Sequence, residues 1–316
     1  MPHFVIPSCA PCLLEAGFQV LYKANGIPSD QSIGRDHPKF NQFMKATQEF
    51  LDILQNFGDK SFPALIASDL LRAVKQITGN SDPYKVERED SNRICLHFYD
   101  KLKSDLSKLE TTKIRLRKAQ FLSIAGNNID FVTPGHTVML TEESIWHILE
   151  AVERIGLIKD DFDILWEDIT ERHPRIVYLL DNAGEIVFDK LVMSILQDEL
   201  GLDVTAVVKG GPVANDVLQQ DAEMVQLIEC CASIITTGTD DVGFHWQKAG
   251  LEFRSAFEGE PLVISKGQAN FEAFNIFGLD MPLVRFFAVL KLKCPANASI
   301  AGGVKGQQVI LHVTPS

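Results

Sequence analysis

The sequence predicts an α/β protein with a Rossmann-like, three-layer α/β/α core and an all-helical N-terminal subdomain. Two observations lead to this prediction. From residue 119 onward, short apolar runs that suit buried strands alternate with amphipathic stretches every ~25 to 30 residues, as βαβ units require. Between Phe40 and Lys118, in contrast, apolar residues recur at helical spacing. We therefore expect a helical subdomain over residues 1–118 and an α/β core over residues 119–316.

The composition narrows the class of protein. A chain of 316 residues that is 46% hydrophobic can bury a sizeable core. The net charge of −12 argues against a nucleic-acid surface, which needs a basic patch. No apolar run reaches the roughly 18 residues of a membrane span, and the N-terminus lacks the basic region of a signal peptide. The six cysteines show no regular spacing, so we expect reduced thiols in a cytoplasmic protein. The sequence does not indicate an oligomeric state.

Cys9-Ala10-Pro11-Cys12 is the first feature that carries chemistry. A C-x-x-C pair can supply two zinc ligands or a redox dithiol, and plain buried cysteines are the alternative. The chain has no second C-x-x-C, so a metal would need a distant partner such as Cys95, Cys294 or a histidine. The C-x-x-C pair therefore leads to the hypothesis that Cys9 and Cys12 bind a structural zinc ion.

The core is organised around residues 176–200. The apolar run Ile176–Leu180 suits a strand that is buried on both faces of a parallel sheet. A polar turn, Asp181–Glu185, follows it, and then apolar residues at helical spacing lead to Gly201 as a helix stop. Ligands of open α/β sheets bind outside the carboxyl ends of the strands, where Asp181 and Asn182 would lie. The alternative is that Asn182 caps the helix and Asp181 fills the turn.

The remaining elements of the core follow the same pattern of apolar runs and polar turns. Two amphipathic helices are expected before the central strand, around Ser144–Ile155 and Phe162–Glu171. Further strands are expected at Phe121–Ala125, Val204–Val208, Ser233–Thr236, Leu262–Ser265 and Val284–Leu290, with Val309–Val313 pairing at an edge.

Polar residues after these strands share one chemistry. They are Asn127 and Asp130, Asp181 and Asn182, Asp216, Asp240, and Lys266 with Asn270. Oxygen ligands of this kind suit Mg²⁺ or Mn²⁺, and a lysine beside them would neutralise a phosphate. Turns at Gly210-Gly211 and Gly238 would let backbone amides approach phosphate oxygens. Together they predict a metal–phosphate site, although Asp216 alone could be a charge at a helix N-terminus and Lys266 a solvated loop residue.

Two phosphate-binding motifs are missing from the sequence. It contains no G-x-x-x-x-G-K-[ST], which excludes a P-loop NTPase. No G-x-G-x-x-G follows the first expected strand, which weakens a dinucleotide or methyl-donor site.

Several blocks of the sequence resemble the signature blocks of the metal-dependent damage-control phosphatases, long known as domain of unknown function eighty-nine. The blocks are Asp181–Glu185, Lys209–Asp216 and Ser265–Glu272. Gly126–Asp130 and Cys9-x-x-Cys12 resemble the smaller, cysteine-bearing branch of that family. The resemblance extends from Cys9 to about Pro295 and implies a helical subdomain on a Rossmann-like core.

The resemblance also implies an activity and a site. A divalent cation, Mg²⁺, Mn²⁺, Co²⁺ or Ni²⁺, would be held by Asp181, Asn182 and Asp216, and Lys266 would hold the phosphate. The substrate would be a small phosphorylated metabolite, such as a sugar phosphate or a damaged cofactor. Asp181 and Lys266 are thus the expected catalytic residues, with metal-held water preferred over an aspartate as the nucleophile. The expected substrate-binding residues are Asn127, Asp130, Glu185, Gly238, Gly267 and Asn270.

Two other functions stay open at this point. A related branch of the family implies a methyl-donor-dependent carboxyl methyltransferase. A phosphometabolite-binding protein could also use the same site without turnover.

Overall fold

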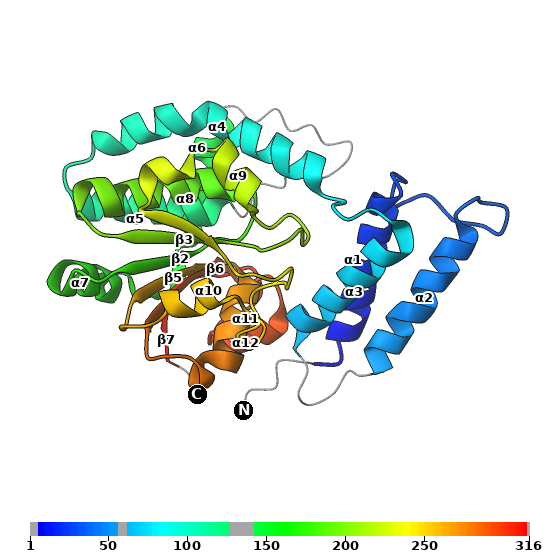
Figure 1. The fold of residues 1–316 in the computed structure, drawn as a ribbon. Helices are drawn as coiled ribbons and strands as arrows, with labels where there is room; N and C mark the ends of the chain where they lie inside the picture. Colours follow the sequence, from blue (N-terminus) through cyan, green and yellow to red (C-terminus); the bar gives the residue numbers. More distant parts are fainter. Residues whose placement is uncertain (1–5, 56–61, 127–141, 315–316) are drawn as a thin grey trace.

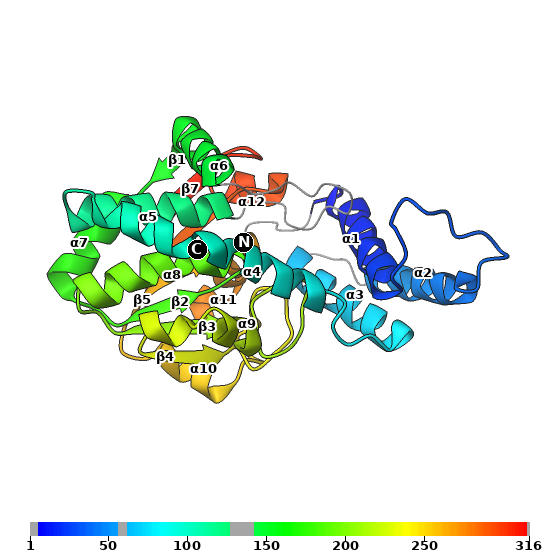
Figure 2. The ribbon, with the colours of Figure 1, turned by 90° about the horizontal axis from the view of Figure 1, so that it is seen from above.

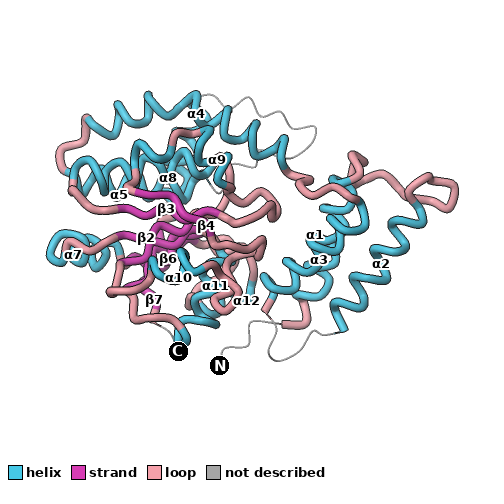
Figure 3. The backbone as a smooth tube through the Cα atoms, viewed as in Figure 1, coloured by secondary structure: helices cyan, strands magenta, loops and turns pink. Residues whose placement is uncertain are grey.

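The computed structural model of the protein describes residues 6–55, 62–126 and 142–314. Three helices, α1 (Cys9–Ala24), α2 (Phe40–Gln55) and α3 (Pro63–Thr78), pack together beside an α/β core (Figures 1 and 3). They share a small core of their own, in which Leu21, Phe50 and Val74 are fully buried. The amphipathic spacing of these segments buries one face of each helix and leaves the other in solvent.

The next two helices belong to the α/β core. α4 (Lys85–Ser107) and α5 (Thr112–Gly126) pack against α8 (Glu185–Ser194). They lie above the sheet in Figure 1, on the side that faces the viewer in Figure 2. The expected domain boundary at residue 118 falls within α5. The division of the chain into these two domains stays a prediction.

A seven-stranded sheet in the order β1-β7-β6-β5-β2-β3-β4 forms the centre of the described core. All neighbouring strands are parallel except β6 and β7, which are antiparallel. The strands are β1 (Leu157–Asp160), β2 (Ile176–Leu179), β3 (Val204–Val208), β4 (Ser233–Thr236), β5 (Leu262–Lys266), β6 (Arg285–Lys291) and β7 (Gln308–Val313). The other helices are α6 (Glu142–Ile155), α7 (Phe162–Arg172), α9 (Gln219–Met224), α10 (Leu251–Ala256), α11 (Gln268–Phe277) and α12 (Pro295–Ile300), with short turns η1 (Ile195–Glu199), η2 (Leu227–Cys230) and η3 (Gly278–Asp280).

Helices cover both faces of the sheet, as the alternation along β2 shows. Ile176 and Tyr178 face the cluster that includes α4, α5 and α8, whereas Val177 and Leu179 face the cluster that includes α10, α11 and α12. The three-layer α/β/α class predicted from the sequence is confirmed, and the expected strands at β2 to β6 form (Figure 1).

Three expectations about the sheet were wrong. Phe121–Ala125 is the buried end of α5 and not a strand, because a short apolar run also suits a helix enclosed on all sides. The strand β1 was missed, since three of its four residues are exposed and lack an apolar pattern. β1 pairs with β7, so β7 does not form the edge.

The described helices contain no candidate membrane span. None of them combines the length and the apolar character that crossing a bilayer requires.

Candidate metal and phosphate site

The candidate site lies at the topological switch point of the sheet, where the order of the strands reverses. From β2 the chain adds β3 and β4 on one side, while β5 and β6 lie on the other side of β2. β2 and β5 run parallel, with Leu179 opposite Ser265, so their carboxyl ends meet. α8 follows β2 on one face and α11 follows β5 on the other. This is the crevice in which open α/β sheets bind ligands.

A short backbone bridge brings the three predicted metal ligands together. Asn182 and Asp216 pair in an isolated antiparallel bridge. On either side of it, Val217 N donates to Asp181 O at 2.9 Å and Ala183 N donates to Asn215 O at 2.9 Å. The turn after β2 and the loop after β3 are therefore fixed against each other.

Gly267 lets β5 end close to Asp181. Its φ is +80°, and a Cβ at this position would lie 2.1 Å from Cγ and 2.2 Å from Oδ1 of Asp181. Only glycine combines that backbone conformation with so close an approach. The expected substrate-binding Gly267 thus lies directly beside the first expected metal ligand.

Asp216 supplies a buried carboxylate. The residue is only 6% exposed, and within the described residues its Oδ2 accepts no hydrogen bond and has the ammonium of Lys209, 3.4 Å away, as its charge partner. Burial raises the pKa of Asp216 to about 7, and the charge of Asp181 adds to this, while Lys209 opposes it. A buried carboxylate with an oxygen that accepts no hydrogen bond, beside another carboxylate, is a typical place for a cation.

Lys209 is the main site residue that sequence reasoning passed over. Its Nζ lies 3.4 Å from Asp216 Oδ2 and donates to Gly243 O, and it lies 3.5 Å from Asn270 Oδ1. The signal was available, because Lys209 opens the same sequence block that ends in Asp216. The amide of Asn270 donates to backbone oxygens of the ends of both strands, Leu180 O at 3.1 Å and Lys266 O at 2.9 Å.

Lys266 is fully buried among carboxylates. Its Nζ donates to Glu185 Oε1 and to Ser123 O, and it lies 3.2 Å from Asp189 Oδ1. Burial disfavours the charge, but Asp189 and Glu185 outweigh it and raise the pKa of Lys266. Burial also raises the pKa of Glu185 to about 7, against the opposing charge of Lys266. Tyr178 completes the group by donating to Asp189 Oδ1 at 2.8 Å.

Glu185 connects this buried group to the predicted metal ligands Asp181 and Asn182. Asn182 Nδ2 donates to Glu185 Oε2 at 3.3 Å and to Asp181 Oδ2 at 2.7 Å. Asp189 was missed in the sequence although it lies one helical turn after Glu185, because α8 is buried on all sides and has no polar stripe to mark it.

The remaining predicted residues lie around this centre or outside the described chain. Asn127 and Asp130 fall among residues 127–141, outside the described residues. Gly238, with φ +77°, packs the loop after β4 against Gly250 N, 2.8 Å from an added Cβ. Asp240, one of the strand-end carboxylates, pairs with Arg72 and Lys75 of α3.

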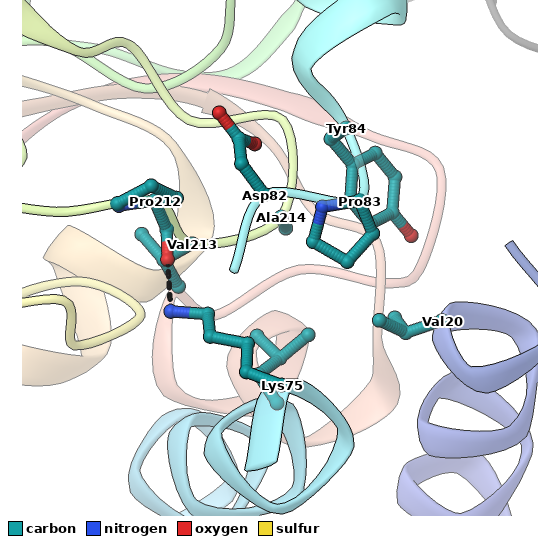
Figure 4. A pocket seen from close by; sticks show the side chains of 9 residues that line it. Val20, Lys75, Asp82, Pro83, Tyr84, Pro212, Val213 and Ala214 are labelled. Carbon is teal, nitrogen blue, oxygen red and sulfur yellow. Dashed lines mark hydrogen bonds between the residues drawn. The ribbon is translucent and has the colours of Figure 1, made fainter. Parts of the chain in front are cut away.

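α3 holds the loop that leads to Asp216. Lys75 Nζ donates to Pro212 O, and beside this contact a small cavity of about 10 Å³ lies between Val20, Tyr84 and Val213 (Figure 4). Ala214 in the same loop has φ +42°, a strained value for a residue with a side chain. The N-terminal helices therefore support the loop immediately before the ligand.

The cysteines do not form a metal site in the described structure. Cys9 is buried, Cys12 is exposed and Cys294 is half-buried. Burial raises the pKa of the Cys9 thiol, and the nearby charges of Cys294 and Glu272 add to the effect. No group of three or more His, Cys, Asp or Glu in the described ranges is arranged to hold a metal ion. The zinc hypothesis for Cys9 and Cys12 therefore stays a prediction.

Comparisons with known proteins show the family to which the chain belongs. The family model described as the damage-control phosphatase ARMT1-like domain matches residues 5–309. The chain belongs to this family. A damage-control phosphatase of Archaeoglobus fulgidus is 28% identical over 306 residues, 96% of this chain and 98% of the relative. A damage-control phosphatase of Pyrococcus horikoshii is 29% identical over 260 residues, 82% of this chain and 85% of that one.

Two further similarities complete the family assignment. An uncharacterized protein of Methanocaldococcus jannaschii is 33% identical over 308 residues, 96% of this chain and 94% of its own. The crystal structure of a DUF89 family protein from Pyrococcus horikoshii superposes with a TM-score of 0.81 at 26% identity, covering 98% of both chains. The family resemblance found in the sequence is confirmed, and two of the relatives are named damage-control phosphatases.

Proposed function

We propose that the protein is a divalent-metal-dependent phosphomonoesterase that acts on a small phosphorylated metabolite. The observation that carries the proposal is the backbone bridge between Asn182 and Asp216, which gathers two carboxylates and an amide at the switch point of the sheet. The family assignment supports phosphate hydrolysis rather than methyl transfer.

The donor set fits a hard divalent cation. Asp181, Asn182 and Asp216 offer oxygen ligands, and the buried Oδ2 of Asp216 has no hydrogen bond within the described residues. Mg²⁺ or Mn²⁺ is bound through such oxygens together with water and substrate phosphate. When bound, the cation would neutralise phosphoryl charge and orient water for attack. The set consists of two carboxylates and one amide. It is therefore not a group of three Asp, Glu, His or Cys ligands, and no such group is arranged to hold a metal ion in the described residues.

The chain's own residues would bind and orient the phosphate. The N-terminus of α11, where Gly267 and Gln268 follow β5, presents backbone N–H groups to an anion at the crevice. Lys209 adds a positive charge beside Asp216. Lys266 would share its charge between the phosphate and its partners Glu185 and Asp189.

Attack by water is favoured over attack by an aspartate, because both aspartates of the centre would be occupied as ligands. Asp181 and Asp216 therefore act by holding and orienting rather than by forming a covalent bond. A cytoplasmic location is part of the proposal, and the six free cysteines agree with it.

The test is hydrolysis of p-nitrophenyl phosphate with Mg²⁺, Mn²⁺, Co²⁺ or Ni²⁺, compared with the chelator-treated protein. Turnover should depend on the added ion, and Asp181→Ala and Asp216→Ala should each abolish it. Asp69→Ala, a surface carboxylate on α3, is the matched control and should be fully active. Metal-independent turnover, or full activity of Asp181→Ala, would contradict the proposal. A panel of phosphorylated metabolites, assayed for released phosphate, would then identify the substrate.

The same assays separate the two other functions. A protein that binds phosphometabolites and metal but releases no phosphate would be a binding protein. Stabilisation by a methyl donor, measured as a thermal shift in the absence of metal, would point to methyl transfer.

A further inference from the structure

One side chain of α4 reaches the turn that carries the metal ligands. Asn92 is fully buried, and its Oδ1 accepts a hydrogen bond from Gly184 N at 2.7 Å. Its Nδ2 donates to Asp221 Oδ1 at 3.0 Å. Asn92 therefore uses both ends of its amide, one on the turn after β2 and the other on α9.

Asp221 extends this contact to the loop after β3. Its Oδ2 accepts from Leu218 N at 2.9 Å and from Arg88 Nε at 3.0 Å. Arg88, also fully buried, donates with its other nitrogens to both oxygens of Asp82 at 2.7 Å. Every polar end of this network is hydrogen-bonded, which makes a buried network rigid and specific.

The network touches the chain two residues away from two metal ligands. Gly184 is two residues after Asn182, and Leu218 is two residues after Asp216. Gly184 has φ +78°, so its backbone turns sharply immediately before α8. A contact that fixes its N–H also fixes the direction of the turn before it.

We propose that Asn92 is a positioning residue for the cation: it sets the place of the Asp181–Glu185 turn relative to the loop that carries Asp216. This inference rests on the proposed function, because it requires a cation at these ligands. Side chains that orient metal ligands typically change metal affinity about 10- to 100-fold when they are removed.

The hydrogen bonds suggest a rescue experiment. Asn92→Asp places a second carboxylate against Asp221 and loses the donor between them. Combining it with Asp221→Asn exchanges amide and carboxylate. The new aspartate still accepts from Gly184 N, and the new asparagine accepts from Arg88 and donates to position 92. Charge and hydrogen bonds are then both restored.

The measurement is Mn²⁺ affinity, read from the electron paramagnetic resonance signal of free Mn²⁺ and thus independent of turnover. Asn92→Ala and Asn92→Asp should bind Mn²⁺ at least about 10-fold more weakly than the unmodified protein. The double variant Asn92→Asp with Asp221→Asn should recover most of that affinity. In Asn92→Ala, kcat should recover at saturating Mn²⁺, whereas half-maximal activity should need more of the ion.

Leu102→Ala is the matched control, because Leu102 is a buried core residue of the same helix, away from the turn. It should lower the melting temperature and leave the Kd for Mn²⁺ unchanged. Should Asn92→Ala not fold, the single and double aspartate variants carry the same comparison.

Three results would overturn the inference. They are an unchanged Kd for Mn²⁺ in both Asn92 variants, a double variant no tighter than Asn92→Asp, or a Leu102→Ala variant that loses Mn²⁺ as strongly. If the unmodified protein binds neither Mn²⁺ nor any other ion of the phosphatase assay, the proposed function fails and the inference fails with it. If the unmodified protein binds Mn²⁺ and the Asn92 variants do so equally well, only the inference fails.

Discussion

Replacing Gly267 by alanine should impair the proposed metal site much more than it destabilises the fold. The added Cβ would lie 2.1 Å from Cγ of Asp181, whereas ordinary contacts begin at 3.4 Å. The carboxylate must therefore retreat by more than about 1 Å, which exceeds the tolerance of close packing. Gly267 also has φ +80° and ψ 156°, a region that is almost restricted to glycine and costs about 1–3 kcal/mol for other residues.

These two effects predict different readouts. The backbone strain of about 1–3 kcal/mol should lower the unfolding free energy by that amount. The displacement of Asp181 should reduce metal-dependent turnover at least about 100-fold, because a misplacement of 1 Å in a catalytic centre has that effect. Denaturant titration measures the first quantity, and hydrolysis of an aryl phosphate at fixed Mn²⁺ measures the second.

Gly79→Ala provides the control for strain alone. Gly79 closes α3 with φ +72°, and no atom lies within 4 Å of an added Cβ. This variant should lose about 1–2 kcal/mol of stability and keep its turnover. If Gly267→Ala loses no more activity than Gly79→Ala, the close approach of Gly267 to Asp181 is not part of the working site, and the assignment of Asp181 as a ligand is refuted.

Three further predictions follow from charges and thiols near the site. Lys293 is exposed after β6 and its charge acts on Asp216, so Lys293→Ala should raise KM for a phosphate ester severalfold at low salt and leave kcat unchanged, as steady-state kinetics would measure. Burial raises the pKa of Glu272 from 4.5 to about 7 in the folded protein. The stability that the protonated carboxyl contributes to the fold is therefore fully present below pH 4.5 and is lost as the pH rises through 7. The unfolding free energy should fall by about 3 kcal/mol over this window, and denaturant titrations of Glu272→Gln should lack that slope. If Cys9 and Cys12 hold zinc, elemental analysis should find about one zinc per chain, lost together with thermal stability in the double serine variant.

Much of the fold could be predicted because the buried strands are continuous apolar runs between glycine or polar turns. Ile176–Leu180 and Val204–Val208 carry this signal strongly, and both form strands. The signal fails where burial is unusual. Phe121–Ala125 is apolar because α5 is enclosed by other helices, and its short length gives no helical period. Leu157–Asp160 is mostly exposed and gives no strand pattern.

The site was predictable as far as it follows strand ends. Asp181 and Asn182 come directly after β2, Asp216 lies in the loop after β3, and the parallel pairing of the two strands together with the Asn182–Asp216 bridge brings them together. Residues that reach the site from elsewhere leave no such mark. Asn92 is 92 positions away in sequence from its partner Gly184, within a charged helical segment. Its importance depends on which way α4 crosses α8, and only the packed structure shows that.

The charges at the centre of the proposed site leave an excess that a divalent cation would balance. Asp181, Asp216, Glu185 and Asp189 are the carboxylates, whereas Lys209 and Lys266 are the lysines in contact with them. With every group ionised, this set carries two more negative than positive charges. Burial makes that excess costly, and it raises the pKa of both Asp216 and Glu185 to about 7.

A cation of charge +2 would balance this excess without any proton. It would also allow Asp216 and Glu185, whose pKa values are raised, to ionise at neutral pH, since a nearby positive charge favours the charged form of a carboxyl group. The phosphate of a substrate then brings new negative charge to a neutral centre. Lys293 and the N-terminus of α11 follow the carboxyl ends of β6 and β5 and contact each other there, where both would favour that charge. The carboxylates and lysines of the proposed site would therefore be neutral only with a cation of charge +2, and this balance, more than any single ligand, supports the proposal of metal-dependent phosphate chemistry.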